Sequence, residues 1–182
     1  LVVTGDLGGA YTGLQILERE HSVFLANPNM QPEMEGYDYI LERQLKPEAR
    51  TDIKKMLQEL DIRPTSMIDV SDGLSSETLH LSDQSKVGFR IYEEKIPMDS
   101  LTISTAEELN LNPVMCALSG CEDYELLFTI APTDFEKIKS HPDFTVIGHA
   151  VDLDQGNYLV ARGSSELVAL NAQGWDAFLN KG

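Results

Sequence analysis

Residues 66–79 read SMIDVSDGLSSETL, and this stretch joins a predicted strand to a predicted helix. The apolar residues of 65–70 favour a strand, and either Ser71 or Asp72 is a suitable N-cap for a helix over 75–85. Two carboxylates, Asp69 and Asp72, therefore stand where a strand passes into a helix N-terminus. They either cap the helix or hold a cation such as Mg²⁺, which takes one or two carboxylates together with water and phosphate oxygens. Their spacing alone favours capping.

Strands and helices follow one another irregularly on both sides of this stretch. Further strands are predicted at 1–4, 87–92, 124–130, 144–151, 157–163 and 166–170, with a hairpin formed around residues 152–156. Further helices are predicted at 10–20, 37–45, 51–60, 104–110 and 132–141. Because the order lacks strict βαβ alternation, the sequence predicts an α+β fold in which helices pack on a mixed β-sheet.

The charge balance excludes two classes of partner. The chain has 182 residues, with 30 acidic against 14 basic residues and a net charge of −16. Such a balance argues against nucleic acid and against an anionic membrane surface, because both are bound through cationic side chains. No apolar run approaches the roughly 20 residues that a membrane span needs. A small phosphorylated ligand remains compatible, since Mg²⁺ held by carboxylates would supply the positive charge.

The cysteines and the first residues bear on compartment and domain organisation. Cys116 and Cys121 lack a second pair, which argues against a disulfide scaffold or a zinc cluster and favours reduced cytoplasmic thiols. The chain starts with LVVTG, a strand without an initiator methionine. We therefore expect one domain that is part of a longer protein.

A second acidic stretch, SGCEDYELLF (119–128), leads into a strongly apolar strand. Glu122, Asp123 and Glu125 would be costly to desolvate unless a cation or hydrogen-bond donors met them. Taken alone, the stretch favours a solvated start of a buried strand.

Two further stretches carry weaker signals. GDLGGA (5–10) matches neither a Walker P-loop nor GxGxxG, and it favours a tight strand-to-helix turn. In QGWDAF (173–178), Trp175 and Phe178 either anchor the chain end or present one aromatic face to a flat heterocycle.

Together these stretches resemble a known family. VTGDLGGAYTGL, PEAR, SMIDVSDGL, ALSGCEDYELLFTI, VIGHAV and GWDAF occur in the order found in thiamine-monophosphate kinases. That family belongs to a superfamily with aminoimidazole ribonucleotide synthetase, selenophosphate synthetase and a hydrogenase maturation factor. The resemblance spans essentially the whole chain. It implies that residues 1–182 are the single C-terminal domain of a two-domain enzyme, with the N-terminal ATP-binding and dimerisation domain absent from this chain.

The resemblance also implies an activity. The complete protein, expected to be a cytoplasmic homodimer, would use ATP and Mg²⁺ to phosphorylate thiamine monophosphate to thiamine diphosphate. The isolated domain would be inactive. Residue by residue, Asp69 and Asp72 match Mg²⁺ ligands, and Ser71 matches a contact to the ATP phosphates. Glu122 and Asp123 match substrate contacts, and either Trp175 or Phe178 matches the aromatic residue that stacks on thiamine.

Two positions depart from the family pattern, and two other interpretations remain. Cys121 stands where the family commonly has glycine, and Gly9 stands where it often has aspartate. The first alternative is another ATP-using superfamily member, of aminoimidazole ribonucleotide synthetase or selenophosphate synthetase type. The second is a non-catalytic ligand-binding or assembly module. Turnover of thiamine monophosphate by the complete protein would separate the three.

Overall fold

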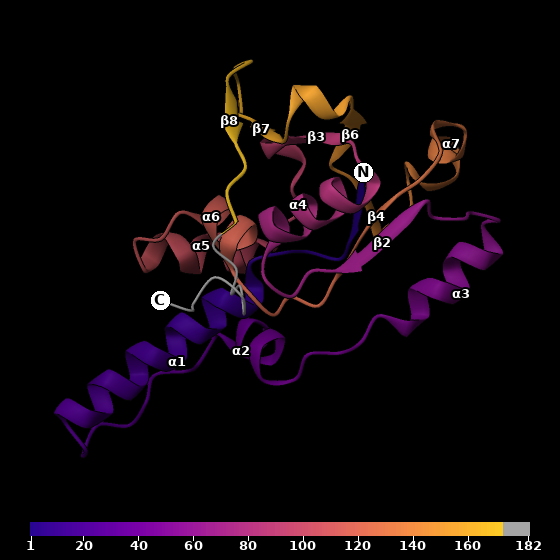
Figure 1. Cartoon of the computed structure of the whole chain (residues 1–182). Helices are drawn as coiled ribbons and strands as arrows, with labels where there is room; N and C mark the ends of the chain where they lie inside the picture. The colour runs from indigo at the N-terminus through magenta and orange to yellow at the C-terminus, as the bar shows by residue number, and fades with distance from the viewer. Residues whose placement is uncertain (173–182) are drawn as a thin grey trace, which may run out of the picture.

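The computed structural model describes residues 1–172 and has the predicted α+β architecture, but its strands form two sheets rather than one (Figure 1). The first sheet is antiparallel throughout, in the order β2 (Ser66–Asp69), β4 (Leu126–Thr129), β1 (Val2–Thr4), β5 (Phe144–Val146). The second sheet has the order β6 (Gly148–Val151), β3 (Gly88–Tyr92), β7 (Tyr158–Val160), β8 (Leu167–Ala169). It is mixed, because β3 runs parallel to β7 and antiparallel to β6.

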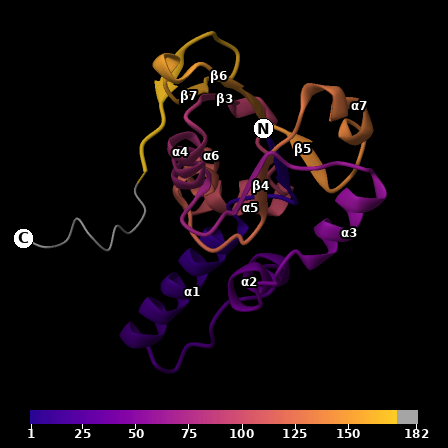
Figure 2. The same cartoon turned by 45° about the vertical axis from the view of Figure 1, so that its right-hand side comes forward.

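Helices surround the first sheet. Their bounds are α1 Gly9–Ala26, α2 Asp38–Leu45, α3 Thr51–Glu59, α4 Leu74–Ser85, α5 Ser100–Glu108, α6 Pro113–Ser119 and α7 Phe135–Ile138. Short 3₁₀ turns lie at η1 Glu93–Lys95, η2 Pro132–Asp134 and η3 Leu153–Gln155. Figures 1 and 2 show α3 and α7 on one side of the first sheet, with α4 and α6 on the other.

The two faces of the first sheet support two hydrophobic cores. Successive strand residues point to opposite faces, so Val3 and Leu127 enter one core while Val2 and Phe128 enter the other. The first core also contains residues of α4, α6 and the second sheet. The second core contains apolar residues of α3, α7 and β5. Both faces of the sheet are therefore covered, which leaves the strand ends as the places where polar side chains gather.

Two expectations about secondary structure were wrong, and one helix was not predicted. The strand predicted over 144–151 divides at Ile147, and its halves belong to different sheets. The predicted hairpin is absent among the described residues, because β3 lies between β6 and β7. Helix α6 was missed, although Asn112 accepts hydrogen bonds from two of its first amides and Pro113 occupies its first turn, which are ordinary start signals.

Within residues 1–172, no helix combines the length and the apolar composition required to span a membrane.

Candidate active site

The turn after β2 is held by Glu77, not by a cap from Ser71 or Asp72. Helix α4 has Gly73 as its N-cap residue, with φ 102° and no side-chain cap bond. A Cβ on Gly73 would lie 2.8 Å from the carbonyl oxygen of Leu118, so the turn requires glycine. Glu77 Oε1 accepts hydrogen bonds from the amide of Asp72 at 2.8 Å and from the amide and hydroxyl of Ser71, each at 3.2 Å. The prediction that the side chain of Ser71 or Asp72 caps this helix is thus wrong.

This arrangement leaves Asp69 and Asp72 without internal partners. Asp69 is exposed at the end of β2, and Asp72 is half-buried in the turn. Neither carboxylate makes a hydrogen bond or ion pair with any of residues 1–172. Two carboxylates without a counter-charge fit a divalent cation that also takes phosphate and water oxygens. No set of three or more His, Cys, Asp or Glu side chains in the described part of the chain has metal-binding geometry, so the two aspartates would provide an incomplete shell.

The second acidic stretch is hydrogen-bonded directly to this turn. Glu122 donates its amide to the carbonyl of Ser71 at 2.8 Å, and Tyr124 donates to Val70 at 2.9 Å. Val70 in turn donates its amide to Glu125 at 2.7 Å. These backbone bonds place the exposed Glu122 side chain beside the turn that carries the aspartates. The structure therefore brings together the two stretches that are about 50 residues apart in the sequence.

The side chains of residues 122–125 alternate between the surface and the interior of the fold. Glu122 has φ 72° and Tyr124 has φ 52°, a left-handed conformation that costs a non-glycine residue roughly 1–2 kcal/mol. Asp123 and Glu125 lie in the interior, whereas Glu122 is exposed and Tyr124 is half-buried. The surrounding hydrogen bonds maintain a conformation that separates adjacent acids into inward and outward sets.

Asp123 lies inside the fold and caps helix α1. Its Oδ2 accepts the amide of Gly8 at 2.7 Å, and its Oδ1 accepts the amide of Ala10 at 3.2 Å. The side chain is fully shielded from solvent. Burial raises the pKa of Asp123 to about 6, although the Gly8 amide and the charge of Arg43 favour its ionised form. The GDLGG turn is thus a strand-to-helix turn, as predicted, and its cap comes from the other acidic stretch.

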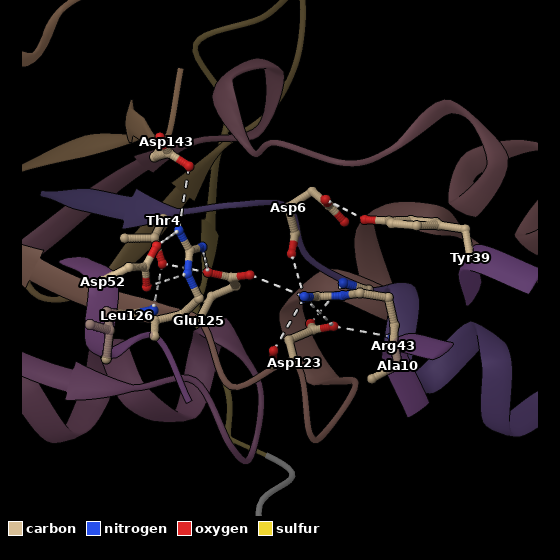
Figure 3. Close-up of polar contacts among 12 residues, drawn as sticks. Thr4, Asp6, Ala10, Tyr39, Arg43, Asp52, Asp123, Glu125, Leu126 and Asp143 are labelled. Atoms are coloured by element: carbon tan, nitrogen blue, oxygen red, sulfur yellow. Dashed lines mark hydrogen bonds and ion pairs between the residues drawn. The ribbon is translucent and has the colours of Figure 1, made fainter. Parts of the chain in front are cut away.

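Glu125 is the centre of a buried ion-pair network (Figure 3). Its Oε1 lies 3.1 Å from Arg43 Nη1, and its Oε2 lies 2.6 Å from Arg50 Nη1. The hydroxyl of Thr4 also donates to Oε2 at 2.5 Å and accepts the amide of Leu126. Glu125 is 3% exposed, and its two oxygens are each paired with an arginine. The network ties α2 and the start of α3 to the ends of the central strands β1 and β4 of the first sheet.

Arg43 joins the remaining segments to this network. Its Nη2 donates to the carbonyls of Asp6 at 3.0 Å and Asp123 at 3.2 Å, and lies 3.8 Å from Asp123 Oδ1. Tyr39 donates its hydroxyl to Asp6 Oδ2 at 2.6 Å, as Figure 3 shows. Burial is the main factor raising the pKa of Asp6. One arginine therefore fixes α2 against both the GDLGG turn and the acidic stretch.

The sequence reasoning missed Glu77, Arg43 and Arg50. Arg50 belongs to the PEAR stretch, which carried the family resemblance but no assigned role. Nothing local to Arg43 indicates its partners, since they lie 37 to 82 residues away in the sequence. Glu77 carried a usable signal, because an acid near the start of a helix can accept the free amides of the preceding turn.

The other predicted site residues are placed as follows. Ser71 is half-buried and bonded to Glu77, and the Glu122 carboxylate accepts a hydrogen bond from Gln44 at 3.2 Å. Cys121 is exposed, so a residue larger than glycine fits this turn by pointing to solvent. Trp175 and Phe178 lie outside the described residues. The predicted ligand contacts stay predictions.

Curated proteins similar to this chain are thiamine-monophosphate kinases. The chain is 30% identical over 177 residues to that of Aquifex aeolicus, covering 97% of this chain and 50% of the relative. It is 32% identical over 184 residues to that of Escherichia coli O157:H7, covering 98% and 52%. The predicted resemblance to thiamine-monophosphate kinases is confirmed, and the chain spans about half the length of the curated relatives it matches. No protein-family model matches the chain.

Solved structures share the fold of this chain. A structure described as AaThiL complexed with AMPPCP and TMP is 30% identical and has a TM-score of 0.76, over 97% of this chain and 50% of that one. Escherichia coli HypE, a hydrogenase maturation protein, has a TM-score of 0.66 at 16% identity, over 98% and 51%. The second likeness concerns the fold alone. Both support the predicted α+β fold of the aminoimidazole ribonucleotide synthetase-like superfamily.

Proposed function

We propose that this chain is the C-terminal domain of a cytoplasmic, two-domain thiamine-monophosphate kinase that transfers a phosphoryl group from ATP to thiamine monophosphate. The observation that carries the proposal is the pair of carboxylates Asp69 and Asp72, which have no partner among residues 1–172 and lie on the turn beside Glu122. Relatives named for this activity match the chain along nearly its whole length. One solved relative is described as a complex with AMPPCP and TMP, an ATP analogue and a thiamine phosphate.

Asp69 and Asp72 would bind Mg²⁺, which supplies positive charge against the phosphates when it is bound. The two residues fit this role because, within the described chain, no arginine or lysine neutralises them. The backbone of the turn is fixed by Glu77, so both carboxylates start from defined positions. Since the chain provides an incomplete shell, we propose that phosphates, water and the N-terminal domain complete it.

The remaining residues would position the substrates. Ser71 would contact the phosphates of ATP from the turn before α4. Glu122 would contact thiamine monophosphate, and Trp175 or Phe178 would stack on its ring. We place Asp123 behind the substrate contact, because its carboxylate is bonded to the start of α1. We assign no protein nucleophile, since phosphoryl transfer depends mainly on positioning and charge stabilisation.

The test is turnover by the full-length protein, which we propose is a homodimer. With ATP, Mg²⁺ and thiamine monophosphate it should form thiamine diphosphate and ADP in equal amounts, and chelation of the metal should stop the reaction. The isolated 182-residue chain should be inactive. Turnover of an aminoimidazole precursor or selenide, with none of thiamine monophosphate, would replace this function with that of another superfamily member.

A further inference from the structure

A cavity lies next to residues 69–72, which we call the acid turn, between the segment that joins α2 to α3 and the ends of β2 and β4. Its volume is about 350 Å³, and it is lined by residues 47–50, Asp69, Tyr124 and Leu126. Asp69 and Leu126 are the last paired residues of β2 and β4 in the first sheet, so the cavity lies at the end of this strand pair. We call this space the Tyr124 cavity. Because Asp69 belongs both to its wall and to the acid turn, a ligand in the cavity would also reach the turn.

The wall formed by residues 47–50 is fixed in place by Arg50. Its guanidinium lies 2.6 Å from Glu125, 3.1 Å from Asp52 and 3.4 Å from Asp143. Three carboxylates therefore hold this side chain, and their negative charge compensates its positive charge. On the opposite side, the backbone of Tyr124 is held by the hydrogen bond that its N–H donates to the carbonyl of Val70. The cavity is thus bordered by restrained segments on both sides, as expected for a largely preformed ligand site.

The chemistry of the lining favours a flat organic cation. Pro47, Ala49 and Leu126 supply apolar surface, and Tyr124 supplies an aromatic ring. Glu48 adds a carboxylate that has no ion pair within residues 1–172, and Asp69, the proposed Mg²⁺ ligand, also lines the cavity. An aromatic ring and nearby negative charge both stabilise a cation that is removed from bulk water. A neutral purine would gain the apolar contact but not the charge interaction.

We propose that the Tyr124 cavity binds the positively charged ring system of thiamine monophosphate. This proposal rests on the proposed function and adds a ring subsite to it. The ring would occupy the cavity while the phosphate reaches the turn at Asp72, since Asp69 lies between the two. Tyr124 is added to the aromatic contact predicted for Trp175 or Phe178, and the proposal stands without that contact.

The first experiment fills the cavity from an exposed position. Ala49 is exposed, so Ala49→Trp in the full-length protein introduces a large side chain without disturbing either core. We expect the KM for thiamine monophosphate to rise by about tenfold or more, with the KM for ATP unchanged. Ala150→Trp is the matched control, because Ala150 is also exposed and lines a separate cavity of about 520 Å³. That variant should keep both wild-type KM values.

The second experiment tests the ring and the charge. Tyr124→Ala should weaken thiamine binding by about threefold to tenfold, and Tyr124→Phe should restore it, because the aromatic face and not the hydroxyl makes the contact. Calorimetry with thiamine and with thiochrome, its uncharged oxidation product, separates charge from shape. Thiamine should bind more tightly than thiochrome. Glu48→Gln should reduce the difference in affinity between these two ligands.

The outcomes separate this proposal from the proposed function. An active wild type whose KM for thiamine monophosphate is unchanged by Ala49→Trp would overturn the subsite and leave the kinase function intact. Equal affinity for thiamine and thiochrome would overturn the role of charge. A wild type that binds thiamine, loses that binding in Ala49→Trp and forms no thiamine diphosphate would keep the subsite and remove the kinase function.

Discussion

The acidic residues of the 122–125 segment and of the turn after β2 have the same chemistry but two opposite kinds of surroundings. Asp123 and Glu125, the buried acids, accept amides or face arginines inside the fold. Asp69, Asp72 and Glu122, the open acids, are exposed or half-buried and form no ion pair with a cationic side chain among the described residues. The difference shows that the counter-charge, rather than the residue type, separates a structural carboxylate from one available for a ligand. The following predictions test that separation.

Asp72→Asn should have the largest effect, and it should affect activity alone. If Asp72 binds Mg²⁺ between phosphates, its loss should lower kcat of the full-length protein by about 10³-fold, comparable to the loss of a strong charge-stabilising group. Because Asp72 contacts no cation in the described structure, the free energy of unfolding should stay within about 0.5 kcal/mol of wild type. Wild-type turnover would remove the metal role. A large loss of stability would place Asp72 with the buried acids.

Glu125→Ala should show the reverse pattern, with stability as the primary loss. Removing the carboxylate leaves Arg43 and Arg50 largely buried without their shared partner, which should cost about 3 to 5 kcal/mol in urea denaturation. Glu59→Ala, which removes the exposed pair with Lys55, is the control and should cost less than about 1 kcal/mol. If Glu125→Ala lowered the free energy of unfolding by no more than Glu59→Ala does, the buried network would contribute little to stability.

Asp123 should give a smaller effect that depends on pH. Its folded-state pKa of about 6 lies above the ordinary value of 3.8, so the folded state binds the extra proton between those values. The stability contribution is therefore fully present below about pH 4 and is lost as the pH rises through 6. The shift corresponds to at most about 3 kcal/mol. The free energy of unfolding, measured relative to Asp123→Asn, should fall over this range.

An NMR titration of the Asp123 carboxyl in the wild type checks the same pKa without a variant. A midpoint near 6 would agree with a burial-dominated site. A midpoint below 4 would show that the Gly8 and Ala10 amides and Arg43 outweigh burial, and would reverse the expected pH dependence.

Local patterns were sufficient for most of the secondary structure. Helices α2 and α3 and strands β1, β2 and β3 lie close to their predicted bounds, since apolar periodicity and turn residues act over a few neighbours. The division of 144–151 between two sheets was not predictable, because one apolar run contains no information about which strand pairs with each half. The same limit explains the false hairpin.

The sequence by itself determined the α+β class, the acidic balance and the two stretches that carry the candidate site. It also indicated the family, through motifs that are read in order along the chain. Only the tertiary structure decided which acids are open. Burial of Asp123 and Glu125 depends on Gly8, Ala10, Arg43 and Arg50, which are distant in sequence and meet them only when α1 and α2 pack at the sheet edge. A carboxylate's role follows from its neighbours in space, and local sequence does not specify them.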